Sequence, residues 1–406
     1  MFGRSLLTIF FVLLLVSTLT RQVALLAVAL LVLLSYAVAR LWQRLCLTSI
    51  EYEREFGEQR VFFGEEVDLR IRISNRKLLP LAWLDVEDDF PAAVTLVGHV
   101  YSPHFLDNRA FLQHLISLRW YERVTRRYRL LCNVRGYHQF GPVRLQSGDI
   151  FGFFLKDKVL PHVDYLLVYP KVVPISELNI PSKQPFGELR TRQHIFEDPS
   201  RLAGVRQYAY GDSLRKIHWK ASARTQELQV KLYESTTTID LIVFLNLTTF
   251  RFAWQGTQPI LLELAITTAA SLVNYGIEEG YRVGLIVNGN QVNSDQPIRI
   301  MPSQDPEQLT RVLEALAKVT SIASSSIEAL LYRESKNLPW GATIAVVTPL
   351  ATEDMLAELL RLKKAGHRVA LILTADVAPA GNLDWLKVYC VGGEEVWHGL
   401  KELQLA

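Results

Sequence analysis

From residue 239 onward the chain alternates between short apolar segments and amphipathic ones. The apolar segments have the length of buried strands and lie at 239–245, 282–287, 343–348, 368–374 and 387–391, with a further strand-like piece around Ile298. Helical patterns occupy 260–275, 306–319, 353–365 and 394–403. Strands that are apolar throughout need helices on both faces, so this alternation predicts a doubly wound, mostly parallel α/β sheet. Ligands of such sheets usually bind at the carboxyl ends of the strands.

An earlier part of the chain, residues 49–169, changes to a period of two. Val67, Leu69, Ile71 and Ile73 alternate with polar residues, which is typical of a half-buried antiparallel strand. Further strand-like pieces lie at 83–86, 117–121 and 128–134. Their spacing predicts a small all-β sandwich. The stretch 135–154 is glycine-rich, and we interpret it as two tight structural turns that bracket a strand.

The first 45 residues hold two apolar runs, 6–19 and 23–38. Each is shorter than the roughly 20 residues of a straight spanning helix, but together they are too long for a signal peptide. They predict a two-helix membrane anchor. Arg4 on one side and Arg40 and Arg44 on the other favour a topology in which both ends, and hence the soluble domains, face the cytoplasm. The alternative is a cleaved signal peptide, which would place the soluble part outside.

The densest polar and aromatic segment lies between residues 192 and 233, just before the first buried strand of the α/β region. The whole chain carries a net charge of only +3, which is too small to imply general binding of polyanions. Arg and Lys outnumber Asp and Glu in this segment, so any electrostatic role belongs to it. The residues that we take as a binding or framework motif are Arg206, Tyr208, Gly211, Asp212, Arg215, His218, Trp219, Lys220 and Arg224.

Within this segment the pattern Y-x-x-G-D-x-x-R-x-I-x-W-x-x-x-A-R resembles the hallmark of the domain of unknown function 58 family. The matching residues are Tyr208, Gly211, Asp212, Arg215, Ile217, Trp219, Ala223 and Arg224. The resemblance implies a multidomain chain: a membrane anchor at 1–45, a β-sandwich at 46–180 and a von Willebrand factor A-like domain at 181–406. It implies no known reaction. It implies a membrane-anchored scaffold or adaptor that works with a MoxR-type AAA+ ATPase in assembling or activating a client protein complex.

Related von Willebrand A domains often bind Mg²⁺ through an Asp-x-Ser-x-Ser turn after the first strand. The matching turn here begins at Asn246 and continues through Thr248 and Thr249 to Phe250, and Thr348 stands where a later Asp is expected. Hard cations prefer carboxylate oxygens, and two carboxylates are missing. We therefore expect a metal-free interaction domain without a cofactor. A weak site that uses Thr248 and a distant acid such as Asp354 is the alternative.

The motif residues allow two interpretations. Arg215, Lys220 and Arg224 could bind an anion or an acidic partner, with Trp219 as a stacking face. Alternatively they form an internal network, in which Asp212 accepts from Arg215 or Arg224 and Trp219 is buried against the sheet. We favour the internal network, and the two interpretations are compatible.

Catalysis finds little support. Asp212 with His218, or Cys132 with His138, are conceivable pairs, but Cys132 lies in an apparent strand where a buried, inert thiol is the default. The phosphate-loop, dinucleotide-binding and zinc-protease signatures do not occur. We expect a non-enzymatic protein. Binding of nucleic acid or phospholipid by the basic aromatic segment is one alternative, although the net charge argues against nucleic acid. An enzyme that acts on cell-envelope substrates is another.

Overall fold

The computed structural model describes most of the 406 residues and divides into two compact units, residues 1–170 and 171–406. The residues outside the description are 1, 21, 99–101, 104–107, 151, 153, 176–196, 210–211, 214–215, 236–238, 252, 293, 295, 376–382, 401–402 and 404–406. Most of the predicted linker after Pro170 therefore lies outside the described residues.

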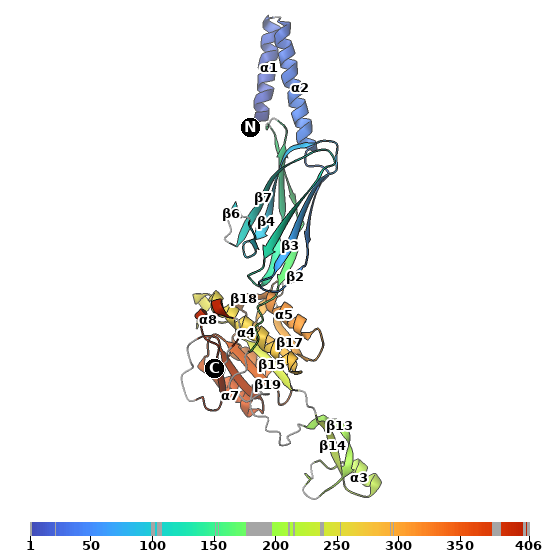
Figure 1. Ribbon diagram of the computed structural model, residues 1–406, viewed down its shortest axis with the longest axis vertical. Helices are drawn as coiled ribbons and strands as arrows, with labels where there is room; N and C mark the ends of the chain where they lie inside the picture. Colours follow the sequence, from blue (N-terminus) through green and yellow to red (C-terminus); the bar gives the residue numbers. More distant parts are fainter. Residues whose placement is uncertain are drawn as a thin grey trace. The chain divides into compact units, whose positions relative to one another are not determined.

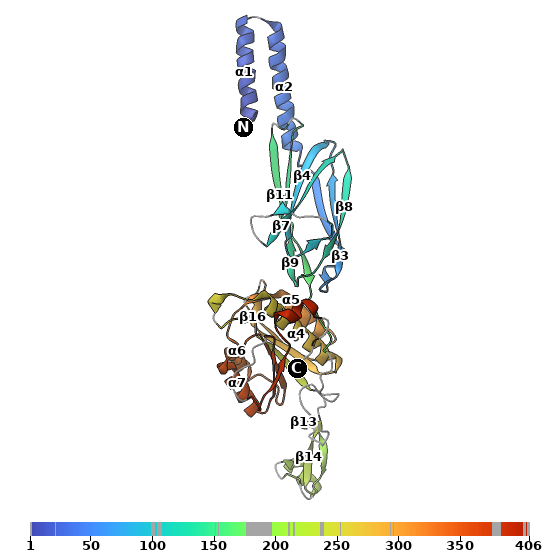
Figure 2. The same ribbon diagram turned by 60° about the vertical axis from the view of Figure 1, so that its left-hand side comes forward.

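The amino-terminal unit begins with two apolar helices that lie side by side, α1 (Phe2–Thr20) and α2 (Val23–Leu45) (Figures 1 and 2). The hydroxyl of Ser17 donates to the carbonyl of Gln22 across the turn, at 3.2 Å. Helix α2 is long and apolar enough to cross a membrane, whereas the described apolar stretch of α1, Thr8–Thr20, is shorter. The predicted pair of apolar helices is present, and α2 continues seven residues beyond the apolar run that ends at Val38.

Among the described residues of this unit, twelve short or medium strands follow. They are β1 (Ile50–Phe56), β2 (Arg60–Val61), β3 (Glu66–Asn75), β4 (Leu81–Pro91), β5 (Thr95–Leu96), β6 (Ser102–Pro103), β7 (Arg109–Leu118), β8 (Arg123–Leu131), β9 (Gly136–Phe140), β10 (Val143–Gly148), β11 (Leu155–Leu160) and β12 (Asp164–Val168). They form sheets in the orders β1-β3-β8-β5, β11-β10-β4-β7-β6 and β2-β12-β9.

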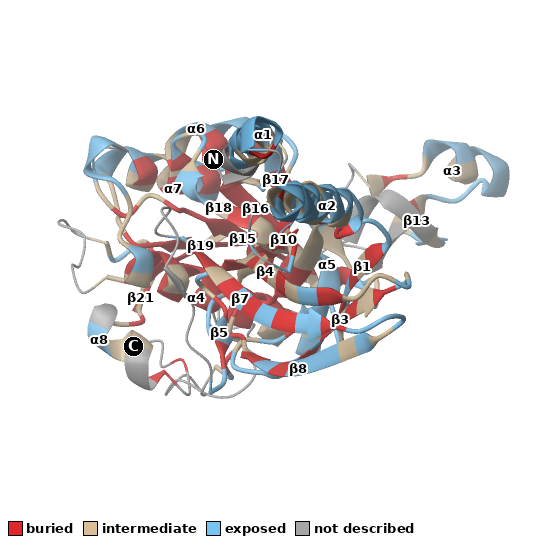
Figure 3. Cartoon of the chain, turned by 90° about the horizontal axis from the view of Figure 1, so that it is seen from above, coloured by how far each residue is buried: buried red, intermediate tan, exposed pale blue. Residues whose placement is uncertain are grey.

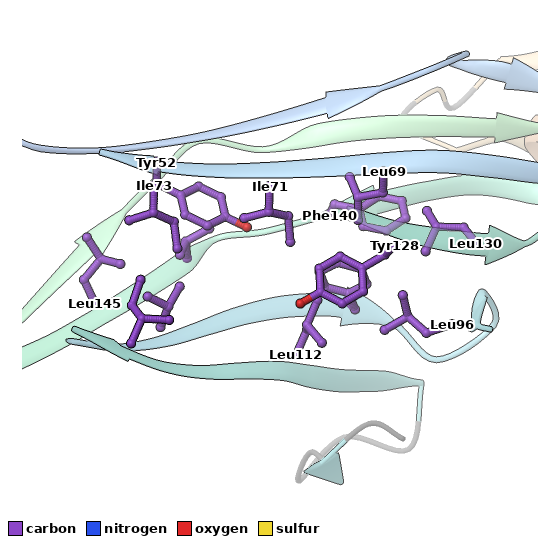
Figure 4. Close-up of a cluster of buried hydrophobic side chains, with 14 of the residues drawn as sticks. Tyr52, Leu69, Ile71, Ile73, Leu96, Leu112, Tyr128, Leu130, Phe140 and Leu145 are labelled. Carbon is purple, nitrogen blue, oxygen red and sulfur yellow. The ribbon is translucent and has the colours of Figure 1, made fainter. Parts of the chain in front are cut away.

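The inner faces of the two larger sheets share one hydrophobic core (Figure 4). Leu69, Ile71 and Ile73 of β3 are fully or almost fully buried, as the alternation predicts. Leu112 of β7 and Leu145 of β10 approach the same core from the second sheet. The predicted strand at 117–121 is wrong in its position: β7 ends at Leu118, and the residues that follow form the turn into β8. The stretch 135–154 contains two strands, β9 and β10, and not one.

A polar cluster interrupts this core. The side chains of Arg54 and Asp88 are completely buried, with Arg54 Nε 3.1 Å from Asp88 Oδ2. A second bond joins Arg54 Nη1 to Asp164 Oδ2 at 2.8 Å, and the Tyr52 hydroxyl donates to Asp88. Burial raises the pKa of Asp88 to about 6, although the Arg54 charge and the Tyr52 hydrogen bond act in the opposite direction.

The second unit contains the predicted parallel sheet. Its elements are β13 (Glu197–Gln207), α3 (Trp219–Thr225), β14 (Gln229–Ser235), β15 (Asp240–Leu245), the short 3-10 helix η2 (Ala253–Gln255), α4 (Pro259–Glu278), β16 (Arg282–Gln291), β17 (Pro297–Ser303), α5 (Gln308–Lys318), β18 (Val319–Ala323), α6 (Ile327–Glu334), β19 (Thr343–Thr348), α7 (Glu353–Lys364), β20 (Arg368–Leu373), β21 (Lys387–Cys390) and α8 (Glu394–Gly399). The sheet order is β17-β16-β15-β19-β20-β21, with β18 paired to β16. Strands β16, β15, β19, β20 and β21 run parallel, while β17 and β18 are antiparallel to β16.

Helices cover both faces of this sheet, with α6 and α7 on one side and α4 and α8 on the other (Figure 3). Ile242 and Phe244 of β15 belong to the core that also contains α6 and α7 residues, and the intervening strand residues are equally buried. Helix α4 is also long and apolar enough for a membrane span, but most of it is buried inside this unit, which identifies it as a core helix. Local signals set α7: Thr352 caps its start, and basic residues occupy its last turn.

Candidate functional site

The order of the parallel strands identifies where this sheet could bind a ligand. Strand β15 is followed in sequence by β16 on one side, and the chain then crosses to β19 on the other side of β15. At such a switch point, here between β15 and β19, the loops that follow the two neighbouring strands run to opposite sides of the sheet. Ligands of open α/β sheets bind in the crevice between these loops, at the carboxyl ends of the strands. The side chains at that crevice come from Asn246 after β15 and from Thr348 at the end of β19.

These two side chains, with Asn288, form a closed hydrogen-bond network. Asn246 Nδ2 donates to Thr348 Oγ1 at 3.0 Å, and Asn288 Nδ2 donates to Asn246 Oδ1 at 2.7 Å. The backbone N–H of Leu247 donates to Asn288 Oδ1 at 2.8 Å, and that of Thr248 donates to Asn246 Oδ1 at 3.1 Å. All three network side chains are at most 3% exposed. The polar groups at the crevice therefore satisfy one another.

This network bears directly on the degenerate metal-site turn. The oxygen that would face a cation, Asn246 Oδ1, already accepts two N–H groups, and Thr348 Oγ1 accepts from Asn246 and from the backbone of Leu350. Thr249 Oγ1 accepts from the backbone N–H of Gln258 at 2.9 Å. A hard cation needs free oxygens, preferably carboxylates, so this donor set does not fit Mg²⁺. Among the residues that the structure describes, no group of three or more His, Cys, Asp or Glu could hold a metal ion.

The basic aromatic motif lies on a separate small hairpin. Strands β13 and β14 pair antiparallel, with Arg206 opposite Val230, and the chain between them contains α3. Ile217 forms an isolated bridge to Val230, and both side chains are buried. The backbone N–H groups of Tyr208 and His218 donate to Leu228 and Gln229, each at 2.8 Å. Two of the motif residues, Gly211 and Arg215, lie outside the described residues.

Asp212 and Arg206 form a bidentate ion pair in this hairpin. Arg206 Nη1 donates to Asp212 Oδ2 at 2.7 Å and Arg206 Nη2 donates to Asp212 Oδ1 at 2.6 Å. The backbone N–H of Ala209 also donates to Asp212, at 2.9 Å. The hydrogen bonds from Arg206, followed by that from Ala209, lower the pKa of Asp212. An internal partner for Asp212 was expected in Arg215 or Arg224. The described partner is Arg206, and Arg215 lies outside the described residues.

His218 is a helix cap in this structure. Its Nδ1 accepts from the backbone N–H of Ala221 at 3.1 Å at the start of α3. Ser222 donates its hydroxyl to the carbonyl of His218 and accepts the N–H of Gln229 at 2.9 Å, which ties α3 to β14. The imagined acid and base pair, Asp212 with His218, has its members engaged separately.

Trp219 is the principal correction to the sequence prediction. It was expected to be buried against the sheet. Instead it is the first residue of α3 and is 69% exposed. Lys220, Ala223 and Arg224 are also exposed, and residues three and four apart share a helix face. Lys220 and Arg224, four residues apart, share one face, and Trp219 lies about 100° from Lys220 around the same short helix. No residue of this helix is buried, so the indole ring and both cations are exposed around it. Asp212 therefore has an internal partner, Arg206, that the internal-network interpretation did not name, whereas Trp219, Lys220 and Arg224 are exposed.

The second imagined catalytic pair also lacks the properties of a nucleophile and its base. Cys132 is 1% exposed, and burial raises its thiol pKa to about 11. His138 Nε2 lies 2.9 Å from the carbonyl of Val134, and burial lowers the pKa of this imidazole. A buried thiol with a raised pKa is inert at neutral pH.

Comparison with known proteins supports the family resemblance over part of the chain. Residues 204–379 match the family described as "Protein of unknown function DUF58". The chain contains a DUF58 domain. This domain begins within β13 and includes the hairpin, the Asn246 network and most of the parallel sheet. Across 346 residues the chain is 26% identical to the uncharacterized protein YeaD of Bacillus subtilis. This alignment covers 83% of this chain and 80% of YeaD.

Solved structures add little to this assignment. A CARDB domain from Pyrococcus furiosus is 10% identical, with a TM-score of 0.19, and the match covers 29% of this chain and 91% of that one. The sporulation control protein Spo0M from Bacillus subtilis is 13% identical, with a TM-score of 0.17, and the match covers 30% of this chain and 50% of that one. At these scores the solved structures assign neither a fold nor a function to this chain.

Two features of the candidate site were absent from the sequence predictions. The first is Asn288 of β16, which completes the network. A signal for it was available, because Asn288 directly follows the predicted strand 282–287 and so lies near the same sheet edge as Asn246. The second is the pairing of Asp212 with Arg206, which the turn between them makes possible. Sequence spacing alone could not show whether Asp212 pairs with this arginine or with a later one.

Proposed function

We propose that this DUF58 protein is a membrane-anchored, non-enzymatic adaptor that binds its partner through the exposed face of α3. The observation that carries the proposal is the position of Trp219, 69% exposed beside Lys220 and Arg224 on a helix whose own hairpin is held by internal bonds. Trp and Arg are the residue types most enriched at the energetic centres of protein interfaces.

The rest of the hairpin supports a binding role because it holds the helix in place. The bidentate pair between Arg206 and Asp212 fixes the turn before α3, and Ser222 joins the helix to β14. A preorganised surface loses less conformational entropy when it binds. The α/β domain, which we propose to be von Willebrand A-like, serves as the scaffold, and the self-satisfied Asn246 network at its crevice argues for a domain that works without Mg²⁺.

The proposed partner is a MoxR-type AAA+ ATPase that acts on a client complex, as the family resemblance implies. The proposed anchor is the pair α1 and α2, with the soluble domains in the cytoplasm as the Arg40 and Arg44 charges favour. The two cations on α3 predict an acidic surface on the ATPase.

The test is affinity purification of the detergent-solubilised full chain, with mass spectrometry of the proteins that co-purify. The variant is Trp219→Ala with Arg224→Ala, and the matched control is Trp340→Ala with Lys364→Ala, because Trp340 is 70% exposed and Lys364 is exposed at the end of α7. We expect the wild type and the control to recover the ATPase and the α3 variant to lose it. Recovery by all three would place the interface elsewhere.

The same purification distinguishes the anion-binding alternative, which the exposed tryptophan and cations of α3 also allow. Nucleic acid that co-purifies and dissociates steeply with salt would support that alternative. An ATPase complex that survives moderate salt would support the adaptor.

A further inference from the structure

We call the part of the amino-terminal unit formed by β1 to β12 the β-domain. Three of its loops lie at the end where α2 joins it. Strand β1 begins there, and Ile50 pairs with Asn75 at the end of β3, so the β3–β4 loop lies at this end. Ser74 pairs with Arg123, which places the turn between β7 and β8 beside it. The third loop joins β10 to β11 and contacts α2 directly, since Gln43 Nε2 donates to the carbonyl of Leu155 at 2.6 Å. Strand topology therefore gathers these loops around the carboxyl end of the apolar helix.

Each of the three loops exposes large apolar side chains. Leu78 in the first loop is 73% exposed, Trp120 in the second is 65% exposed and Ile150 in the third is 58% exposed. Tyr121 and Leu155 beside them are more than half exposed as well. Single apolar residues on a surface are ordinary, but their recurrence on three separate loops at one end marks an interaction surface. We call Leu78, Trp120, Tyr121, Ile150 and Leu155 the apolar collar.

The third loop extends alongside α2, past the carboxyl end of the helix towards its apolar segment. The ring of Phe154 packs against Tyr36 of α2, with centroids 5.6 Å apart, and the Arg40 guanidinium lies 5.0 Å from the Phe154 ring. Tyr36 precedes Arg40, the first charge after the apolar run, by four residues, or about 6 Å of helix. The loop thus contacts the helix at the level where its apolar segment ends.

Basic residues lie on the end of α2, in the same loops as the apolar collar and at the adjoining strand ends. They are Arg40, Arg44, Arg76, Lys77, Arg119, Arg123 and Lys156. Lys77 and Lys156 donate to backbone carbonyls at the end of α2, with Lys156 Nζ 2.7 Å from the carbonyl of Arg44. The nearby acids Glu51, Glu122 and Asp149 are engaged locally. Glu51 pairs with Arg76 at 2.6 Å, Glu122 accepts the backbone N–H of Arg119 at 2.6 Å, and Asp149 accepts that of Phe154 at 2.6 Å. This end of the domain therefore combines apolar tips with an excess of positive charge.

We propose that the apolar collar is seated in the headgroup region of the bilayer, with Arg119 and Arg123 facing anionic phospholipids. The inference rests on the proposed membrane anchoring and deepens it. A bilayer fits better than a protein because the surface surrounds the end of an apolar helix, where Trp and Tyr favour the membrane interface and cations attract acidic headgroups. The β-domain is then held against the membrane and not suspended on a flexible tether.

The experiment uses the full chain with Cys390→Ser in nanodiscs of phosphatidylcholine and phosphatidylglycerol. A fluorophore is attached to one new cysteine at a time, Leu78→Cys or Trp120→Cys, and quenching by lipids with a nitroxide near the headgroup is measured. Cys46 and Cys132 are buried. The matched control is Glu58→Cys, an exposed position after the other end of β1, which lies about 20 Å along the strand. Leu30→Cys on an exposed face of α2 reports insertion of the anchor itself.

We expect quenching at Leu78 and Trp120 that is several-fold stronger than at Glu58, together with quenching at Leu30 by nitroxides placed deeper in the acyl chains. Quenching at Leu30 with none at Leu78 and Trp120 would overturn the collar and leave the anchor intact. Lack of quenching at Leu30 as well would contradict the anchored state and the collar with it. Replacing Arg119 and Arg123 by Glu should weaken the dependence of collar quenching on the fraction of phosphatidylglycerol, and an unchanged dependence would refute the role of these two cations.

Discussion

Asn246 Nδ2 donates a hydrogen bond to Thr348 Oγ1 at 3.0 Å, joining β15 to β19 at the point where the strand order of the sheet reverses. In an open α/β sheet this position is where a ligand would enter. Both side chains are instead buried and bound to each other. A position that could hold a cation is occupied by an amide and a hydroxyl that stabilise the fold.

Restoring a carboxylate at this position should therefore destabilise the protein. Asn246→Asp removes the donor to Thr348 and buries a negative charge among groups already paired, so we expect a loss of about 1–3 kcal/mol in the free energy of unfolding. The measurement is the thermal midpoint with and without excess Mg²⁺. Thr248→Ala is the control, because Thr248 contacts Asn246 through its backbone N–H, which the substitution keeps. Stabilisation of Asn246→Asp by Mg²⁺ would contradict our interpretation of the site.

The hairpin that carries α3 should respond to acid. Arg206 lowers the pKa of Asp212, so the ion pair contributes stability above the ordinary carboxylate range and loses it as the pH falls through the lowered pKa. We expect the hydrogen-exchange protection of the Ala209 and Leu228 region, measured relative to the intrinsic exchange rate at each pH, to fall in that acidic range. Asp212→Asn should show fast exchange already at neutral pH, with little change in the parallel sheet. Equal protection in both proteins at neutral pH would show that the pair does not order the hairpin.

The parallel sheet was predictable because its signals are local and repeated. Strand Thr343–Thr348 has an apolar centre and is buried throughout, and α7 carries both a capping threonine and a basic last turn. Helix α6 was not predicted, although Ser326 caps it, because its eight residues are too short for a clear period. The sequence also placed α4 correctly, since a long apolar helix between two buried strands is the usual crossover of a parallel sheet.

The hairpin site was less predictable because it depends on how exposed Trp219 is and on which arginine pairs with Asp212. Trp219 was expected in a core from its residue type, yet α3 is a seven-residue helix in which no residue is buried. Asp212 had several arginines within reach along the chain, and only the folded turn brings Arg206 to it. Similarly, the exposure of Trp120 follows from the position of the β7–β8 turn, which was mistaken for strand.

Arg54 should be the most sensitive charged residue of the β-domain. Arg54→Met leaves Asp88 buried without its cation, and we expect a loss of about 3–5 kcal/mol. Cys132 is buried in the same core and reacts with a thiol reagent only when the domain unfolds. The measurement is the urea concentration at which half of Cys132 is labelled, with the labelled cysteine identified by mass spectrometry. The control is Arg72→Met on the neighbouring strand, whose pairs with Glu53 and Glu55 are solvent-exposed and should contribute about 0–1 kcal/mol. Equal effects of the two substitutions would refute the buried pair.

Asp88 should make the stability of the β-domain fall as the pH rises towards neutrality. Its folded pKa of about 6 lies above the ordinary value of 3.8, so between these values the folded state binds more protons than the unfolded state. The decline should amount to at most about 3 kcal/mol across that window. Asp88→Asn keeps the volume of the side chain and should make the urea midpoint of Cys132 labelling nearly independent of pH. Each sample is unfolded at its own pH and then labelled in a brief pulse at one common pH, so that the reactivity of the thiol itself does not vary. Asp85→Asn on the same strand, whose carboxylate accepts from Gln113 at the surface, should retain the decline. A decline that persists in Asp88→Asn would assign the titration to another group.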